Sequence, residues 1–350
     1  MRFIHIADTH LGMQPDKEYP WSEARERENR ESFVRIIELC RKEEPELLLI
    51  AGDLFHHQPL AREMKDVDSL FASIPKTRVV IIAGNHDYIS SVSRYNEHEW
   101  PENVTFFMKE ELESVYFEDL NVEVYGLSFC HRQIHAPLFK GVHPANRDHI
   151  NILLMHGGEQ ANLPIDRNEL AASGFNYIAC GHLHTPIDIT PTMRYCGSLE
   201  PLEKNSVGER GYIKGTIDED GRVESEFVAS SIRQYFKPVV TVNHDTTQLK
   251  LESEIAEIIA ENGRDNIFTF FIRGRRDPEI RFDTETLKLK GNVLDVEDET
   301  VPDYDIEKLR EENGTNLLGE FITHIESCNE EEDIKRKALE YGILALLKQD

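Results

Sequence analysis

The sequence has few cysteines, and none of them is placed to form a disulfide framework or a cysteine-based zinc site. The five cysteines are odd in number, widely spaced, and never form a CxxC pair. This pattern argues against a disulfide-rich secreted domain and favours a reducing, cytoplasmic environment. With 350 residues, 39% of them hydrophobic, the chain can bury a core without such cross-links.

Long apolar runs and an excess of basic residues are also missing. No apolar run approaches the roughly 20 residues that span a bilayer, and no cationic segment precedes an apolar one, so we expect neither a membrane span nor a cleaved leader. The formal net charge is −26. Because DNA binding normally relies on a basic surface, this charge argues against tight DNA binding by the chain alone. It does not exclude a nuclease, because metal cations can hold the scissile phosphate.

Histidine is scarce in the second part of the chain, since 13 of the 15 histidines lie between His5 and His184. The chemistry is therefore expected in the first part. A change of composition near residue 235 predicts three parts: a catalytic domain at 1–234, a small α/β module at 235–301 and a helical segment at 302–350.

Alternating strand and helix patterns predict a layered α/β fold for the first part. Buried strands are predicted at 3–7, 47–51, 79–83, 152–155 and 177–180, further strands at 104–107, 115–117 and 122–127, a hairpin at 212–228, and helices at 24–42, 62–71 and 167–173. In the rest of the chain, strands are predicted at 239–242, 267–272 and 285–289, and helices at 249–261, 305–312, 317–328 and 331–348.

A polar cluster directly follows each of the five buried strands. The clusters are Asp8-Thr9-His10, Gly52-Asp53-Leu54-Phe55-His56-His57, Gly84-Asn85-His86-Asp87, His156-Gly157-Gly158 and Gly181-His182-Leu183-His184. Loops beyond the carboxyl ends of strands in an α/β sheet converge on one crevice, so these residues are expected to form one site. The adjacent glycines allow sharp turns and close approach of the backbone.

The side chains in these clusters are oxygen and imidazole donors without a thiolate. Such a set suits Mn²⁺, Fe²⁺ or Zn²⁺ better than Ca²⁺. An aspartate such as Asp53 can offer one oxygen to each of two metal ions, which lie about 3.5–4 Å apart in two-metal hydrolases. The predicted reaction is hydrolysis of a phosphodiester bond by a metal-bound hydroxide.

Each cluster also has an ordinary structural explanation. The Asp8 and His10 pair can arise by chance, Gly-Asn-His-Asp can be a β-turn, and one of His182 and His184 can be a core histidine. Five clusters in order, each behind an apolar strand, favour the functional interpretation.

In their order and residue types, these motifs resemble those of the calcineurin-like metallophosphoesterase superfamily over about residues 1–230. The stretches Asp-Thr-His-Leu-Gly and Gly-Asp-Leu-Phe-His, with the following α/β module, look more specifically like the SbcD and YhaO DNA-repair exonucleases and their meiotic-recombination relatives. The resemblance implies a four-layer α/β/β/α sandwich with a small α/β capping domain beside the active site and C-terminal helices.

The resemblance also implies roles for the residues of the motifs. One metal ion would be bound by Asp8, His10, Asp53 and His184, and the other by Asp53, Asn85, His156 and His182. His86 would face the phosphate as an imidazole that titrates near neutrality, and Asp87 would orient its ring. His56 matches a second active-site histidine of the recombination nucleases, with His57 as the competing candidate.

The leading functional prediction is a Mn²⁺-dependent DNA nuclease in DNA repair that works with an SbcC-like coiled-coil ATPase. The acidic charge supports such a partner, and the segment 317–348 is an expected docking helix pair whose apolar positions could equally cover the capping module. A homodimer is another assembly compatible with the sequence. The alternatives are a phosphatase or small-molecule phosphodiesterase, and a scaffold without catalysis.

Several other residues attract attention but are predicted to be ordinary surface. Four histidines, His131, His135, His143 and His149, lie in an expected insertion and are predicted to be solvated. Trp21 and nearby arginines could meet DNA, but an exposed helix face is the simpler interpretation. Arg273, Arg275 and Arg276 are either phosphate contacts or part of a locally neutralised acidic surface.

Overall fold

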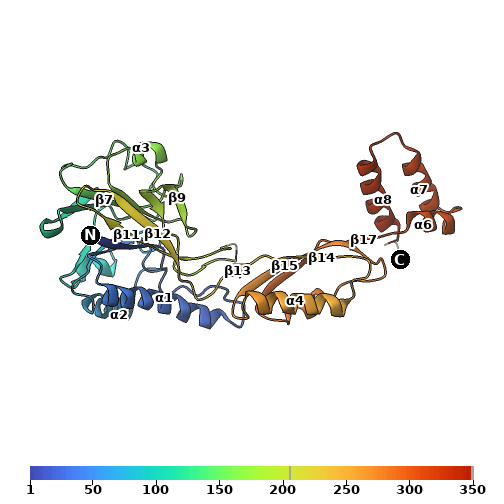
Figure 1. Ribbon diagram of the computed structural model, residues 1–350, viewed down its shortest axis with the longest axis horizontal. Helices are drawn as coiled ribbons and strands as arrows, with labels where there is room; N and C mark the ends of the chain where they lie inside the picture. The colour runs from blue at the N-terminus through green and yellow to red at the C-terminus, as the bar shows by residue number, and fades with distance from the viewer. Residues whose placement is uncertain (205, 348–350) are drawn as a thin grey trace. The chain divides into compact units, whose positions relative to one another are not determined.

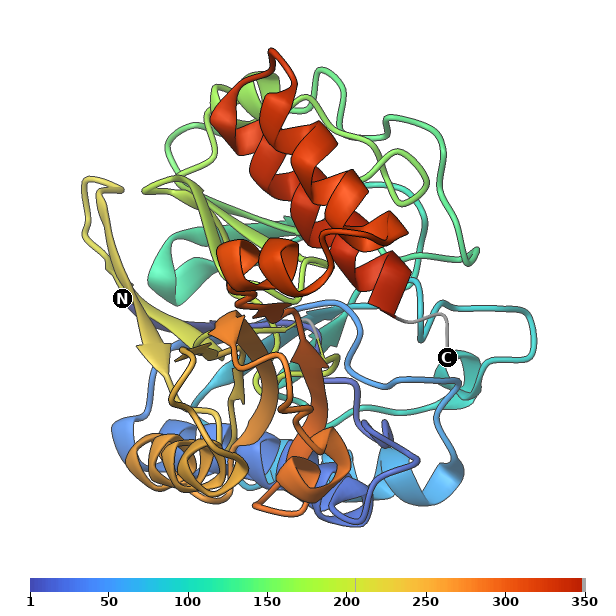
Figure 2. The same cartoon turned by 90° about the vertical axis from the view of Figure 1, so that its right-hand side faces the viewer.

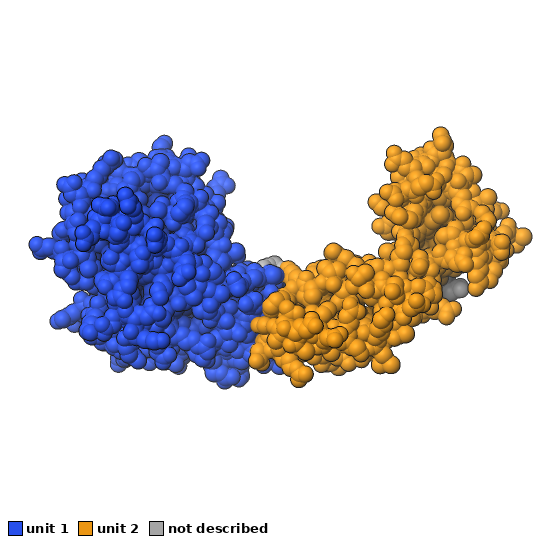
Figure 3. All heavy atoms as spheres, in the orientation of Figure 1, with its two compact units in different colours: residues 1–235 blue, residues 236–350 orange. Residues whose placement is uncertain are grey.

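The computed structural model describes residues 1–204 and 206–347 and divides the chain into two compact units. The first unit comprises Met1–Tyr235 and the second Phe236–Asp350, shown in different colours in Figure 3. A two-residue strand, β13 (Tyr235–Phe236), lies at the boundary.

The first unit contains two six-stranded sheets. The first sheet has the order β12 (Val223–Ala229), β11 (Gly211–Ile217), β1 (Arg2–Ile6), β2 (Leu47–Ala51), β3 (Arg78–Ile82) and β4 (Val104–Phe106). Strands β1 to β4 are parallel, and the β11–β12 hairpin adds antiparallel to β1. The carboxyl ends of β1, β2 and β3 therefore lie at one edge of this sheet.

The second sheet also has a parallel centre, but both of its edge strands are antiparallel. Its order is β5 (Glu113–Phe117), β6 (Val122–Gly126), β7 (Ile150–His156), β8 (Tyr177–Gly181), β10 (Met193–Tyr195) and β9 (Ile187–Thr190). Strands β6, β7, β8 and β10 are parallel, whereas β5 and β9 pair antiparallel with their neighbours.

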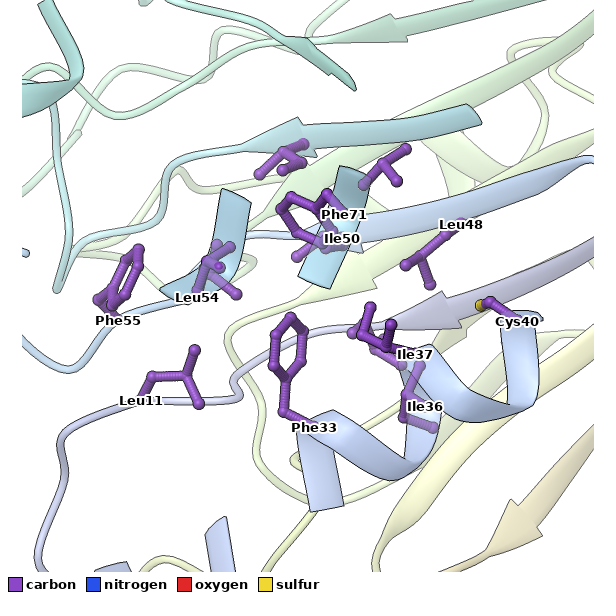
Figure 4. Close-up of a cluster of buried hydrophobic side chains, with 14 of the residues drawn as sticks. Leu11, Phe33, Ile36, Ile37, Cys40, Leu48, Ile50, Leu54, Phe55 and Phe71 are labelled. Atoms are coloured by element: carbon purple, nitrogen blue, oxygen red, sulfur yellow. The ribbon is translucent and has the colours of Figure 1, made fainter. Parts of the chain in front are cut away.

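Side-chain alternation along the strands separates three hydrophobic layers. In β1, Ile4 and Ile6 face the helices α1 (Ser22–Glu43) and α2 (Ala61–Ala72), while Phe3 faces the second sheet. Figure 4 shows the helix-facing layer, in which Phe33 and Phe71 are completely buried. Burying such a side chain contributes about 1.5–3 kcal/mol relative to leaving it exposed.

The short helix α3 (Arg167–Ala171) covers the outer face of the second sheet and completes four layers (Figure 1). Two 3₁₀ turns, Arg94–Glu97 and Glu118–Leu120, lie in the connections. The four-layer α/β/β/α sandwich predicted from the sequence is confirmed, and the predicted strands and helices of this part agree with the structure to within a few residues.

The second unit begins with a small parallel sheet covered by helices. Strand β15 (Ile267–Arg276) pairs in parallel with β14 (Val239–Val242), β16 (Val293–Asp298) and β17 (Val301–Pro302), and α4 (Gln248–Asn262) packs on this sheet through an apolar cluster. The predicted strand at 285–289 is wrong, because α5 (Thr284–Lys288) lies there. The Asp283 carboxylate accepts hydrogen bonds from the amides of Glu285 and Thr286, and this N-cap starts a helix.

Three helices follow: α6 (Ile306–Glu312), α7 (Leu317–Ser327) and α8 (Glu332–Leu347), drawn in red in Figure 2. Helices α7 and α8 pack on each other through Leu318, Ile322, Leu339 and Ile343, and Ile306 and Leu309 of α6 pack against this cluster. The predicted last helix ended at Lys348, which lies outside the described residues. Within the described part of the chain, no helix is both long and apolar enough to cross a bilayer.

Candidate metal centre

The five polar clusters lie at the carboxyl ends of five parallel strands. Asp8 and His10 follow β1, Asp53 and His56 follow β2, Asn85 and His86 follow β3, His156 ends β7, and His182 and His184 follow β8. Backbone hydrogen bonds connect neighbouring loops, from the Asp8 amide to the Gly52 carbonyl and from the His10 amide to the Asp53 carbonyl. The two sheets thus bring residues far apart in sequence to one place.

Four of these residues have a backbone conformation that is uncommon for residues with a side chain. Asp8, His10, Asp53 and His182 have φ angles of 50°, 44°, 51° and 95°. Such positive φ values cost free energy and cluster at functional sites, where the surrounding structure enforces them. The strain here falls on candidate metal ligands from three different loops.

Asp53 lies at the centre of the cluster and is buried. Its Oδ1 accepts a hydrogen bond from the His86 amide at 2.9 Å. Its Oδ2 is buried without a hydrogen-bond partner and lies 3.5 Å from His10 Nε2 and 3.3 Å from His156 Nε2. A buried carboxylate oxygen that accepts no hydrogen bond and lies between two imidazoles is in the position expected of a metal ligand.

The first donor group consists of Asp8, His10 and His184, whose donor atoms lie within 4.8 Å of one another. His10 Nε2 and His184 Nε2 are 3.2 Å apart. Burial lowers the pKa of His184 to about 4 and, reinforced by neighbouring imidazoles, holds the pKa of His10 well below its ordinary value. Both rings are therefore neutral near pH 7, which is the form that binds a metal ion.

The second donor group surrounds the side-chain oxygen of Asn85. This oxygen lies 3.0 Å from His156 Nε2 and 3.0 Å from His182 Nδ1. Burial opposes a charge on His156, but the carboxylates of Asp53 and Asp8 outweigh it and raise the pKa of His156 to about 9. This shift measures how strongly the carboxylates favour a positive charge at this position, and a cation bound there would supply that charge and leave the His156 ring neutral.

Two glycines allow this close packing. A Cβ atom at Gly52 would lie 2.3 Å from His156 Nδ1, and one at Gly84 would lie 2.2 Å from Asp53 Oδ1. The Gly52 φ of +90° also favours glycine, which adopts this conformation without strain. The glycines that precede Asp53 and Asn85 in the sequence are therefore part of the site's geometry.

His86 and His56 lie side by side at the rim of the cluster. Their rings are stacked with centroids 5.0 Å apart, and His56 Nδ1 is 3.2 Å from His10 Nδ1. His56 and His86 are half-buried, whereas His57 is exposed. Of the two candidate histidines in this loop, the geometry favours His56.

Asp87 is buried and has a different set of partners from the one expected. Its carboxylate accepts hydrogen bonds from the amides of Gly84 and Phe55 and from the Tyr95 hydroxyl. Among the described residues no hydrogen bond joins Asp87 to the His86 ring, so the observed contacts hold the loop that carries His86. Sequence reasoning missed Tyr95, for which the motif carries no signal.

A family model for calcineurin-like phosphoesterases matches residues 1–186, just over half of the chain. The chain belongs to this family. The family uses divalent metal ions, which agrees with the donor set and with the orphaned oxygen of Asp53. The family resemblance predicted from the motifs is confirmed.

Similarity to individual proteins extends beyond the family model. The chain is 27% identical to a DNA double-strand break repair protein Mre11 of Methanopyrus kandleri over 65% of this chain and 56% of that protein. It is 27% identical to the uncharacterised metallophosphoesterase YhaO of Bacillus subtilis over 65% of this chain and 60% of that protein. A Mre11 protein of Saccharolobus solfataricus is 24% identical over 95% of this chain and 92% of its own length. The chain thus matches less than two thirds of the first two relatives' lengths.

Three further polar residues of this phosphoesterase contact the candidate ligands from outside. Glu159 and Asn162, on the loop after β7, lie 3.2 Å and 3.4 Å from His182 Nε2. Glu203 lies 3.9 Å from His184 Nδ1. Sequence analysis missed all three, because a contact made by a loop to another loop leaves no spacing pattern.

The residues predicted to be ordinary surface are exposed or have local partners. His131, His135 and His143 are exposed, and His149 stacks on Tyr116 and pairs with Glu123. Each guanidinium of the basic cluster is bonded within its own unit: Arg273 to Glu299, Arg275 to Asp303 and Glu340, and Arg276 to Thr300. These bonds support a locally neutralised surface. Trp21 stacks on Tyr19 and donates a hydrogen bond to Asp16.

Proposed function

We propose that this calcineurin-like phosphoesterase is a two-metal-dependent DNA nuclease. The observation that carries the proposal is the position of the buried Asp53 carboxylate, whose Oδ2 lies between His10 of one donor group and His156 of the other without a hydrogen-bond partner. The substrate class comes from the similarity to two Mre11 proteins, whose name states a role in double-strand break repair.

The residues at the strand ends would hold the ions. Asp8, His10 and His184 would bind one ion, Asn85, His156 and His182 the other, and Asp53 would bind both. When bound, divalent ions such as Mn²⁺ neutralise phosphate charge and acidify water. The neutral rings of His10 and His184 suit this role, since a protonated imidazole cannot donate to a metal.

The stacked pair of histidines would act on the substrate and not on the ions. His86 lies beside the shared carboxylate, tied to it through its own amide. From this position its ring can face a bound phosphate and donate a proton to the leaving oxygen. Asp87 would hold the His86 loop through its bonds to Gly84, Phe55 and Tyr95, and His56 would contribute a second imidazole at the same rim.

The test is hydrolysis by metal-stripped protein reloaded with Mn²⁺. Labelled linear duplex, single-stranded and circular DNA are compared with bis-p-nitrophenyl phosphate. Cleavage of DNA that requires Mn²⁺ supports the proposal, and comparison of linear with circular DNA separates exonuclease from endonuclease action. Cleavage of the chromogenic ester without any DNA cleavage would favour a small-molecule phosphodiesterase.

A partner that contributes DNA affinity is a second part of the proposal. The net charge of −26 opposes binding to a polyanion, so we infer that an SbcC-like coiled-coil ATPase supplies much of the affinity for DNA.

Helix α8 has two apolar faces, one of which is available to such a partner. Leu339 and Ile343 are buried against neighbouring helices. Ile334 and Tyr341, about two helical turns apart, are 50% and 74% exposed. The exposed pair is the part available to a groove or coiled coil.

Co-purification of the ATPase tests this surface. Ile334→Glu and Tyr341→Glu should weaken binding without changing ester hydrolysis, because neither residue belongs to the packed helix cluster. Leu289→Glu is the matched control, since Leu289 is 83% exposed elsewhere in the same unit. Full ATPase binding by a variant that carries both Ile334→Glu and Tyr341→Glu would rule out this docking surface. Deletion of the residues from Asp305 onward is a stronger test of the same surface and should also weaken ATPase binding. Retained ester hydrolysis would show that the truncated protein is folded.

A further inference from the structure

In two of the candidate histidine ligands, His156 and His182, the ring nitrogen that points away from the ion site lies next to an oxygen acceptor. His156 presents Nε2 to Asn85 and Asp53, and its Nδ1 lies 2.9 Å from the Ala51 carbonyl oxygen. His182 is turned the other way, with Nδ1 toward Asn85 and Nε2 3.2 Å from Glu159 Oε2. A carbonyl or carboxylate oxygen can only accept, so it selects the tautomer with the proton on the outer nitrogen.

The outer partner of a metal-binding histidine fixes both its tautomer and the orientation of its ring. Loss of such a partner typically weakens metal binding by about 10–100-fold. For His156 the partner is a backbone carbonyl, which no substitution of a side chain removes. For His182 it is the side chain of Glu159, which can be replaced.

We propose that Glu159 is a positioning residue for the second metal ion. It accepts the Nε2 proton of His182 and so leaves the Nδ1 lone pair directed at the site shared with Asn85. The proposal rests on the proposed two-metal function and adds a residue to it. Glu159 does not itself face the reacting phosphate in this role.

The loop that carries Glu159 is built to hold this position. The Gly158 amide donates to the carbonyls of Asn162 and Leu163 at 3.0 Å each, and the Leu163 amide donates to the Ile134 carbonyl at 2.7 Å. Gly158 packs against Tyr195, where a Cβ would lie 2.2 Å from the hydroxyl oxygen. Although the Glu159 carboxylate is 58% exposed, its backbone is therefore constrained.

Asn162 provides a second polar contact to the same ring nitrogen. Its side-chain amide lies 3.4 Å from His182 Nε2, and its other amide atom, Oδ1, is buried without a partner. Rotation of this side-chain amide by half a turn would place its oxygen, an acceptor, next to Nε2. The loop thus converges on one atom of His182 from two side chains.

Glu203 offers a matched comparison for charge without this geometry. It is 65% exposed and lies 3.9 Å from His184 Nδ1, too far for a hydrogen bond. Removing either glutamate removes one negative charge near the site. Only removal of Glu159 takes away a hydrogen bond to a candidate ligand of the second ion.

The experiment is titration of the full-length, metal-stripped protein with Mn²⁺, followed by calorimetry and by electron paramagnetic resonance of the bound ions. We compare wild type with Glu159→Ala, Glu159→Gln, Glu203→Ala and His182→Ala. Glu159→Ala should weaken the binding of one of the two Mn²⁺ ions by about 10–100-fold and leave the affinity for the other unchanged. Glu159→Gln should retain affinity, because its amide oxygen still accepts the Nε2 proton. Thermal unfolding of the metal-free variants checks that each is folded.

The same titration separates this proposal from the proposed function. Two Mn²⁺ ions in wild type support the two-metal site whether or not DNA is the substrate, and fewer than two would overturn both. Unchanged binding by Glu159→Ala, or an equal loss from Glu159→Ala and Glu203→Ala, would overturn the positioning role alone. Combining Glu159→Ala with His182→Ala should cause no loss beyond that of His182→Ala, since residues that act through one contact are not additive.

Discussion

The backbone amide of His86 donates a hydrogen bond to Oδ1 of Asp53 at 2.9 Å. One oxygen of the central carboxylate therefore positions the loop that carries the candidate acid, while Oδ2 is buried without a donor. The placement of His86 and the binding of ions are coupled through a single side chain. Substitutions at the two positions are nevertheless expected to have different consequences.

Asp53→Ala should abolish activity and remove both metal ions. The loss of a carboxylate that both donor groups share disrupts the two sites together. Metal analysis of the purified variant is the measurement, with Asp119→Ala as a control on an exposed aspartate that pairs with Arg78. A stoichiometry of two metals per chain in Asp53→Ala would contradict the bridging role.

His86→Ala should retain both metals and lose turnover. A general acid typically contributes about 10²–10⁴-fold, and the alanine variant keeps the backbone amide that binds Asp53. Steady-state hydrolysis of DNA and metal analysis of the same preparation check the two halves of this prediction. His57→Ala should retain turnover, because this neighbouring histidine is exposed. Near-normal activity of His86→Ala would remove it from the mechanism.

Buried thiols predict a loss of stability at high pH. Burial raises the pKa of the Cys40 thiol to about 12, whereas an unfolded thiol has a pKa of about 8.5. Between these values the unfolded chain releases a proton that the native state keeps, so stability is full below the unfolded pKa and falls as pH rises. The slope is about 1.4 kcal/mol per pH unit for one thiol.

Urea unfolding at about pH 8 and about pH 10.5 measures this fall. Cys40→Ala should be less stable than wild type at the lower pH, because the substitution leaves a cavity. Its stability should nevertheless fall less than that of wild type between the two pH values. The comparison cancels other groups that titrate in this range. An equal fall in both proteins would show that Cys40 is not responsible.

The fold of the first unit could be predicted because its core strands are apolar runs with a clear layer assignment. The carboxyl-end rule then brought the motif residues together without any knowledge of side-chain positions. The strand predicted at 285–289 failed because Asp283 caps a helix whose only buried residue is Leu287. A five-residue segment carries too little periodicity to overcome such local chemistry.

The outer contacts of the site could not be predicted from the sequence. Tyr95 reaches Asp87 from a 3₁₀ turn, and Glu159 reaches His182 from a loop after a different strand. Neither contact has a fixed spacing, because each depends on how two loops fold over the strand ends. The motifs therefore identify candidate ligands, and the structure identifies what holds them.

Gly52→Ala should disrupt the second donor group more than its backbone strain alone explains. A Cβ at this position would lie 2.3 Å from His156 Nδ1, so the imidazole must move away from the Ala51 carbonyl and from Asn85. Gly208→Ala is the matched control: its φ of +91° is close to the +90° of Gly52, and nothing lies within 4 Å of its added Cβ. Both variants carry the strain of a positive φ, of order 1–3 kcal/mol, and both should melt at a lower temperature. Only Gly52→Ala should also lose a metal ion in the Mn²⁺ titration, and equal metal binding by the two would show that His156 tolerates displacement.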